Sequence, residues 1–302
     1  MNEKIKLMQP NVGEEELKLV EQVIKSGNLV EGKMVEEFEK TVCEFTGAKY
    51  AIACTSATTG LELALRALNV GQGDEVIIPD FTHPATALVV QTVGAKPILV
   101  DVDLESYNTD ALYIKKAITK NTKAIIPVSI FGNPLDMDSI TEIGKENNIP
   151  VIEDAACSLG SEYKNKKVGN LADMTVFSFH PRKIFSTGDG GLITTNNKDY
   201  FELMISIKRF GAGEVDGKST FVRWGTNYRM SDILGAVALG QVRKIGQIVE
   251  DRIQKALIYN RLLAEVEGTT IPRIENFSKS NYQTYAVFIK NSKRDAVMRE
   301  MR

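Results

Sequence analysis

The sequence predicts an α/β protein in which helices cover a largely parallel, seven-stranded sheet. Short apolar runs of strand length alternate with helical stretches from Tyr50 to Thr195, and helical crossovers between strands are typical of parallel sheets. Polar residues follow several of these runs, at the strand ends where open α/β sheets bind their ligands. The length of 302 residues allows one large domain and a smaller second domain.

The elements of the large domain follow in a regular order. Two amphipathic helices, at 14–25 and 34–45, have apolar residues on one face and are expected to cover the sheet from outside. The runs expected to form strands are 50–54, 75–78, 97–100, 124–128, 151–154, 174–179 and 192–195. The helices expected between them are 61–68, a stretch that ends at 93, 110–118 and 136–146. We assign residues 1–240 to this domain.

A smaller α+β domain is predicted for residues 241–302. A long helix at about 248–266 leads into it. Two short apolar runs, 271–274 and 285–289, are expected to be strands, and 294–301 a further helix.

One connection between two apolar runs carries a lysine. Lys183 lies five residues after Ser178, and a Gly-Asp-Gly-Gly turn at 188–191 follows it. A lysine in a turn is ordinarily a solvated surface residue. Here it lies between two buried strands, and the turn behind it needs the backbone freedom of glycine. A lysine held in a partly desolvated pocket has a lowered pKa and can attack a carbonyl to form a Schiff base.

Composition excludes several classes of function. The chain has 37 Lys and Arg against 39 Asp and Glu, and this balance argues against nucleic acid as a partner. It has no run of about 18 apolar residues, so we expect no membrane span. The N-terminus lacks an apolar signal core, and three widely spaced cysteines fit a reducing compartment, so we expect a cytoplasmic protein. With two histidines and no Cys-x-x-Cys, no metal site is expected.

The two commonest nucleotide-binding motifs of α/β sheets are absent. The Gly-x-Gly pairs that begin at residues 71, 188 and 211 lack the third glycine of a dinucleotide-binding turn. No Walker sequence is present either. The two commonest nucleotide-binding interpretations of an α/β sheet therefore lose support.

Several motifs together resemble one family. Ser-Phe-His-x-x-Lys at 178–183, followed by Thr-Gly-x-Gly-Gly at 187–191, looks like the cofactor-lysine segment of the DegT/DnrJ/StrS sugar aminotransferases. These are pyridoxal-phosphate (PLP) enzymes of fold type I. The resemblance extends from Ile5 to Gln241 and includes Glu-Asp-Ala-Ala at 153–156 and Phe-Gly-Asn-Pro at 131–134. It implies a PLP-dependent aminotransferase (transaminase) in which Lys183 binds the cofactor and moves protons.

The resemblance gives Asp154 and the residues after the first strand their roles. Asp154 ends a strand, and on its own would be interpreted as a helix cap; in the family it faces the pyridine nitrogen of PLP and keeps it protonated. Hydroxyls and free N–H groups at a helix N-terminus form an anion site, although an ordinary cap is an equally good interpretation of such residues. The resemblance assigns the phosphate to Ser56, Ala57, Thr58 and Ser178.

Three further residues are assigned by the same resemblance, and the role of a fourth, Arg182, stays open. His83 takes the position of the side chain that stacks on the PLP ring, with Phe81 as the competing candidate. Asn227 matches the asparagine that reaches the phosphate of the other subunit, which implies a homodimer with shared active sites. Cys157 stands near the 3-hydroxyl of PLP, where the family often has Gln or His. Arg182 is either a substrate contact or a solvated residue.

The chain also departs from the family. Ser129 stands where His is frequent. Family members normally continue beyond the position of Arg302, so we expect an incomplete second domain, whose unpaired strand edges would make it poorly stable.

The resemblance implies amino transfer to a nucleotide-linked keto sugar, with glutamate as the donor, in amino sugar and polysaccharide biosynthesis. Two other functions are possible from the sequence: a PLP-dependent sugar dehydratase, and a regulator that binds PLP or a sugar nucleotide without turnover. Dehydratases of the family typically lack the lysine, so Lys183 disfavours the first alternative.

Overall fold

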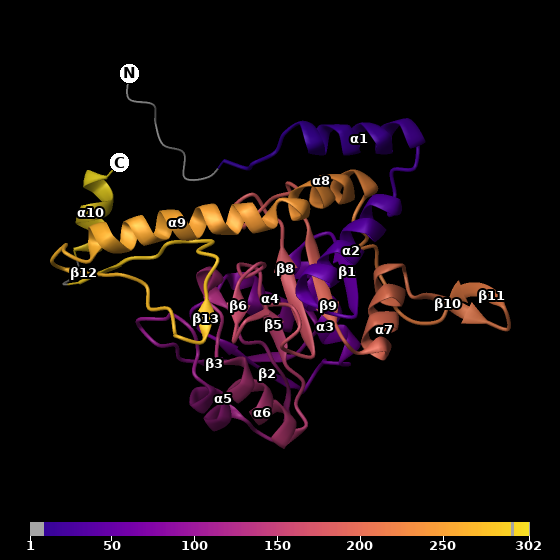
Figure 1. Ribbon diagram of the computed structural model, residues 1–302. Helices are drawn as coiled ribbons and strands as arrows, with labels where there is room; N and C mark the ends of the chain where they lie inside the picture. Colours follow the sequence, from indigo (N-terminus) through magenta and orange to yellow (C-terminus); the bar gives the residue numbers. More distant parts are fainter. Residues whose placement is uncertain (1–8, 291–292, 302) are drawn as a thin grey trace.

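The structure is a computed structural model that describes residues 9–290 and 293–301, and its elements follow the predicted alternation (Figure 1). The helices are α1 (Glu14–Ser26), α2 (Lys33–Thr46), α3 (Ala57–Ala67), α4 (Pro84–Thr92), α5 (Ala111–Ala117), α6 (Met137–Asn147), α7 (Lys198–Lys208), α8 (Asp232–Arg243), α9 (Ile245–Leu263) and α10 (Arg294–Glu300), with a 3-10 turn η1 (Ile130–Gly132). The first eight residues, where the sequence shows no signal core, lie outside the described residues. No helix among the described residues is long and apolar enough to cross a membrane.

The strands include the seven that the sequence predicts for the large domain and seven others. The seven predicted strands correspond to β1 (Tyr50–Cys54), β2 (Glu75–Pro79), β3 (Lys96–Val100), β4 (Thr122–Ile125), β5 (Ile152–Asp154), β8 (Met174–Ser178) and β9 (Gly191–Thr195). The other strands are β6 (Glu162–Tyr163), β7 (Lys166–Lys167), β10 (Ala212–Val215), β11 (Lys218–Phe221), β12 (Thr269–Thr270), β13 (Ser278–Lys279) and β14 (Phe288–Ile289). Of these, only β14 lies within a run for which the sequence predicts a strand, 285–289.

The seven predicted strands form two sheets rather than one continuous ladder. One sheet has the order β1-β9-β8-β5 and the other β3-β2-β4. Two isolated parallel bridges, Ile125 to Val151 and Val128 to Asp154, connect β4 and the residues after it to β5. The pairs β2–β3, β2–β4 and β5–β8 are parallel, whereas β9 is antiparallel to both β1 and β8.

Both faces of the four-stranded sheet are buried under helices. Successive strand side chains point to opposite faces; in β1, Ala51 and Ala53 pack into the cluster that includes α1, α2 and α8, while Ile52 and Cys54 pack toward α3, α4 and α7. This layering leaves the carboxyl ends of β5 and β8 as the place where polar side chains can gather.

Helix α3 begins four residues earlier than predicted. Ser56 is its N-cap: Ser56 Oγ accepts a hydrogen bond from the Thr59 nitrogen at 3.2 Å, and Thr59 Oγ1 accepts one from the Ser56 nitrogen at 3.1 Å. This reciprocal pair satisfies two N–H groups and fixes the start of the helix. Ala57 and Thr58 therefore belong to the first helical turn and not to a loop.

The predicted strand at 271–274 is wrong. Pro272 has no N–H to give to a ladder. The neighbouring Arg273 nitrogen donates to the Glu105 carbonyl at 3.2 Å, and the Arg273 carbonyl accepts from Asn133 Nδ2 at 3.1 Å. The segment is thus bonded to loops of the large part of the chain. Further along, β13 pairs with β6, and the strand predicted at 285–289 is reduced to β14, which pairs with β12.

The division into residues 1–240 and 241–302 stays a prediction. Its boundary lies inside α8, and α9 follows α8 almost at once along the top of Figure 1.

Gly191, the first residue of β9, lies against the start of α3. A Cβ at this position would lie 2.5 Å from the Ala57 nitrogen and would overlap the Ser56 carbonyl group, all of it backbone that cannot move aside. We expect Gly191→Ala to lower the free energy of unfolding by about 1–3 kcal/mol, the usual cost of overpacking, measured by urea denaturation. Gly246→Ala is the matched control, because Gly246 has nothing within 4 Å of the added carbon and Ala is favoured in a helix. Equal midpoints for the two variants would contradict this packing.

Glu153 is a buried carboxyl on β5. Its Oε1 accepts from Ser129 Oγ at 2.6 Å, its Oε2 accepts from Thr175 Oγ1 at 3.4 Å, and burial raises its pKa from 4.5 to about 7. Between pH 4.5 and about pH 7, Glu153 is protonated in the folded protein and ionised in the unfolded chain. The stability that comes from this bound proton is therefore fully present below about pH 4.5 and is lost as the pH rises through about 7.

We therefore expect the free energy of unfolding to fall between pH 5 and pH 8 more steeply in the native protein than in Glu153→Gln, which is neutral throughout. The difference between the two slopes should amount to roughly 2–3 kcal/mol over this range. Urea denaturation at both pH values measures it. Parallel pH profiles would show that Glu153 does not hold its proton in the folded state.

Candidate active site

The turn that carries Lys183 is anchored by buried aromatic residues. Phe179 and Phe185, on either side of the lysine, are buried and stack with ring centroids 4.8 Å apart. The Lys183 nitrogen donates to the His180 carbonyl at 2.8 Å, and the Thr187 nitrogen donates to the Phe179 carbonyl at 3.0 Å. The apolar side chains therefore fasten both ends of the turn to the core, and the lysine between them is held as predicted.

The Lys183 ammonium lies beside a thiol and near a carboxylate. Its Nζ is 3.3 Å from Cys157 Sγ. Its positive charge lowers the pKa of the Asp154 carboxyl, although burial outweighs this effect and raises that pKa overall. The fully buried Lys208, in contrast, is paired with the carboxylates of Glu31 and Glu39. Among the salt bridges of the described residues, none includes Lys183.

Asp154 is the last residue of β5 and is only 5% exposed. Its Oδ1 accepts from the Ala156 nitrogen at 3.2 Å and its Oδ2 accepts from Thr86 Oγ1 at 2.9 Å. Because β5 pairs with β8 in parallel, Asp154 and the turn after β8 lie at the same end of the sheet. The carboxylate and the amine predicted to act together are thus brought together, and Asp154 is not a helix cap.

Thr86 was not found by the sequence analysis. It is fully buried in the first turn of α4, and its hydroxyl bonds Asp154 across 68 positions of sequence. A signal was present: Thr86 lies three residues after His83 and directly inside the helix that Pro84 begins.

The proposed phosphate residues gather at the start of α3. Ser178 is paired with Gly191 in the ladder, and Gly191 touches the backbone of Ser56 and Ala57. The first turn of a helix leaves N–H groups without intrahelical partners, and in the described residues those of Ala57 and Thr58 have none in the rest of the chain. Thr58 is exposed, and so can meet a ligand.

His83 and Asn227 are both exposed. His83 is the N-cap of α4; its Nδ1 accepts from the Ala85 nitrogen at 3.2 Å, and its charge is close enough to Asp154 to lower the pKa of that carboxyl. The Asn227 Oδ1 accepts from Arg229 Nε at 3.0 Å. Arg229 does not pair with Asp232, whose Oδ1 accepts from backbone nitrogens at the start of α2.

A segment from the C-terminal part, residues 280–284, completes the wall of the site; we call it the strap. Asn281, fully buried, donates from Nδ2 to the carbonyls of Cys157 and Leu159 at 3.0 and 2.8 Å. The Gln283 side chain donates to the Arg182 carbonyl, and the Thr284 nitrogen donates to the Phe131 carbonyl at 3.3 Å. The strap thus touches both neighbours of the lysine, Cys157 in space and Arg182 in sequence.

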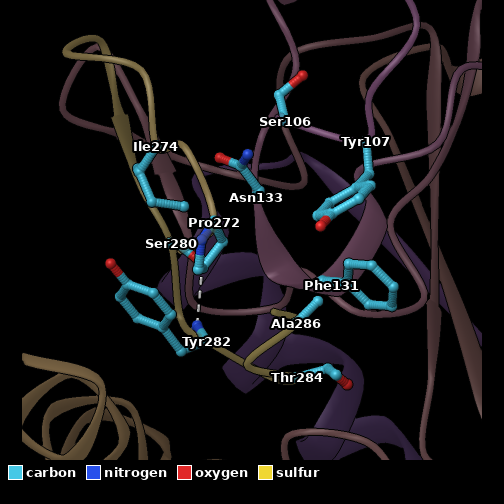
Figure 2. A pocket seen from close by; sticks show the side chains of 10 residues that line it. All are labelled: Ser106, Tyr107, Phe131, Asn133, Pro272, Ile274, Ser280, Tyr282, Thr284 and Ala286. Atoms are coloured by element: carbon cyan, nitrogen blue, oxygen red, sulfur yellow. Dashed lines mark hydrogen bonds between the residues drawn. The ribbon is translucent and has the colours of Figure 1, made fainter. Parts of the chain in front are cut away.

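A small pocket lies between the strap and the large part of the chain (Figure 2). Tyr107 and Phe131 face Pro272 and Tyr282 across it. The pocket is lined by Ser106, Tyr107, Phe131, Asn133, Pro272, Ile274, Ser280, Tyr282, Thr284 and Ala286. Neither Lys183 nor Asp154 is among them, so this pocket is next to the site and is not its centre.

The residues at the carboxyl ends of β5 and β8 fit PLP. They offer an amine for an aldehyde, a carboxylate for a pyridinium nitrogen, and a helix N-terminus for a phosphate. Because Gly191 has no side chain, none lies between Ser178, its partner in the ladder, and the start of α3. No group of three or more His, Cys, Asp or Glu side chains in the described part of the chain is arranged to hold a metal ion.

Comparison with known proteins agrees with this geometry. Residues 10–302 match the DegT/DnrJ/EryC1/StrS aminotransferase family. The UDP-4-amino-4-deoxy-L-arabinose–oxoglutarate aminotransferase of Shewanella sediminis is 38% identical over 287 residues, which cover 91% of this chain and 74% of that protein. The GDP-perosamine synthase of Caulobacter vibrioides is 38% identical over 274 residues, 89% of this chain and 74% of that protein.

A solved structure shows the same fold. The sugar aminotransferase Spr1654 of Streptococcus pneumoniae, described as putative and solved in its PMP form, superimposes with a TM-score of 0.93 at 27% identity, covering 98% of this chain and 81% of that one. The predicted α/β fold and the predicted cofactor, PLP, are confirmed by this match and by the family. The chain belongs to the DegT/DnrJ/EryC1/StrS aminotransferase family and is a PLP-dependent aminotransferase.

Proposed function

We propose that the enzyme transfers an amino group from glutamate to a keto sugar linked to a nucleotide. The observation that carries this proposal is that Lys183 and Asp154 lie at the same end of neighbouring strands, where the charge of the amine acts on the carboxyl. The names of two relatives, which refer to a UDP-linked and a GDP-linked amino sugar, support the substrate class. We expect the enzyme to act in amino sugar and polysaccharide biosynthesis, with glutamate as the amino donor.

PLP, when bound, supplies an electrophilic carbon for the amine and a ring that takes up electrons. Lys183 Nζ would then be the base that takes the proton from the α-carbon of the donor and the acid that delivers it to C4′ of the cofactor. Asp154 holds a proton at the pyridine nitrogen. The N–H groups of Ala57 and Thr58, with Ser56 and Ser178, bind the phosphate, and His83 stacks on the ring.

Cys157 and Asn227 complete the proposed set. Cys157 lies on the same side as the Lys183 amine, as its 3.3 Å contact indicates, and is assigned to the neighbourhood of the 3-hydroxyl. Asn227 is exposed and bonded only to Arg229 among the described residues, which suits a residue that acts in the site of a second subunit.

A homodimer and a cytoplasmic location stay proposals. The hairpin formed by β10 and β11 projects from the body at the right of Figure 1. Phe221, the last residue of β11, is 71% exposed, and Trp224, three residues later, is 57% exposed. Exposed aromatic side chains of this kind support burial against a second copy of the chain.

Lys183→Ala is expected to abolish covalent attachment of PLP and to lower turnover at least about a thousandfold, since no other residue of the site carries an amine. Protein incubated with PLP is reduced with borohydride, and the peptide that contains residue 183 is examined by mass spectrometry. Lys198→Ala, which removes an exposed surface lysine, is the control and should keep both properties. Attachment at another lysine would remove Lys183 from this role.

The reaction itself is tested with glutamate and a series of nucleotide-linked keto sugars. Appearance of 2-oxoglutarate together with an amino sugar supports the proposal. Loss of water from the sugar without amino transfer identifies a dehydratase, and PLP binding with no change in either substrate identifies a regulator; both outcomes contradict it.

A further inference from the structure

Two threonine hydroxyls form a chain that ends on Asp154. Thr82 Oγ1 lies 2.9 Å from Thr86 Oγ1, and Thr86 Oγ1 lies 2.9 Å from Asp154 Oδ2. Thr86 is fully buried and Asp154 is 5% exposed, whereas Thr82 is half-buried. The chain thus runs from the surface of the turn before α4 to the carboxylate at the end of β5.

The direction of the protons in this chain is fixed by chemistry. An ionised carboxylate can only accept hydrogen bonds, so Thr86 donates to Asp154. A hydroxyl has a single proton to donate, so Thr86 must accept from Thr82. Hydrogen bonds arranged head to tail in this way polarise and strengthen one another.

The start of α4 places both hydroxyls. His83 is the N-cap and Pro84 the first helical residue, with its φ already suited to a helix. Thr82 precedes the cap and Thr86 follows it in the first turn, so the two residues are i and i+4 neighbours on one side of the helix start. The same turn that carries His83, the proposed ring-stacking residue, therefore also carries the partner of Asp154.

We propose that Thr86, ordered by Thr82, is a positioning residue that fixes the rotation of the Asp154 carboxylate and holds it ready to accept the pyridine N–H. This inference rests on the proposed role of Asp154. The other groups that act on Asp154 are the Lys183 ammonium and His83, which favour its charge, and the Ala156 nitrogen, which bonds Oδ1. The buried carboxyl of Glu153 and the half-buried thiol of Cys157 are its titratable neighbours. Among the side chains bonded to the carboxylate, the Thr86 hydroxyl is the one that opposes the effect of burial.

Thr86→Val removes the hydroxyl and keeps the shape of the side chain. In the cofactor-free protein, the pKa of Asp154 is expected to rise by about one to two units, the loss expected for a hydrogen bond to a charged group. Carbon-13 NMR of labelled aspartate carboxyls measures it, with Asp154→Asn identifying the signal. In the PLP-bound enzyme, the dissociation constant for PLP should rise about tenfold, and the acidic limb of the kcat/KM profile should move to higher pH. Thr86→Ser restores the hydroxyl and should restore all three quantities.

Thr175→Val is the matched control. Thr175 is 1% exposed on the strand beside Asp154, but its hydroxyl donates to Glu153 and not to Asp154. This variant removes the same atoms at nearly equal burial. The acid dissociation constant of Asp154 and the dissociation constant for PLP should therefore both stay within about twofold of the native values. If Thr86→Val and Thr175→Val give the same titration of Asp154, the positioning role is overturned.

Two further outcomes are decided by the same design. If Thr86→Val does not fold, Thr82→Val removes the outer, half-buried hydroxyl and should raise the Asp154 pKa by a smaller amount; no change would overturn the inference. If the native protein does not bind PLP, the proposed function fails, yet the titration in the cofactor-free protein still shows whether Thr86 controls Asp154.

Discussion

The structure depends on compensation for the cost of burying one carboxylate, that of Asp154. Asp154 is almost fully enclosed, and burial alone raises its pKa. An isolated buried charge is costly unless it is bonded and faced by an opposite charge. The Lys183 ammonium, the Ala156 nitrogen and the Thr86 hydroxyl provide this compensation from three different segments. The turn after β8, the turn after β5 and the first turn of α4 must therefore converge on a single point.

Sequence reasoning located the parts of the site that are local in the chain. Lys183, its glycine turn and Asp154 each follow an apolar run, so the strand ends could be recognised without coordinates. Thr86 could not be recognised in this way, because its role depends on a hydrogen bond to Asp154, which is 68 residues away in the sequence. The start of α3 was placed too late because Thr59, inside a Thr-Thr-Gly stretch, completes the cap with Ser56.

The C-terminal part shows more clearly where the pattern of apolar residues fails to predict secondary structure. Apolar residues at 271–274 suggested a strand, yet the backbone there is bonded to Glu105 and Asn133, partners that periodicity does not reveal. Likewise, the expected single seven-stranded sheet is two sheets joined by isolated bridges, because β4 ends at Ile125 and Val128 reaches Asp154 on its own. Short strands are decided by tertiary bonding more than by their own sequence.

Asn281 adds a consequence for the timing of biosynthesis. It binds the carbonyls of Cys157 and Leu159, residues that leave the ribosome more than 120 positions before it does. A nascent chain that already contains the lysine turn has therefore not yet acquired this wall of its catalytic centre. Long-range closures of this kind are among the slow events of folding, so this wall can form only after the chain has been synthesised as far as Asn281.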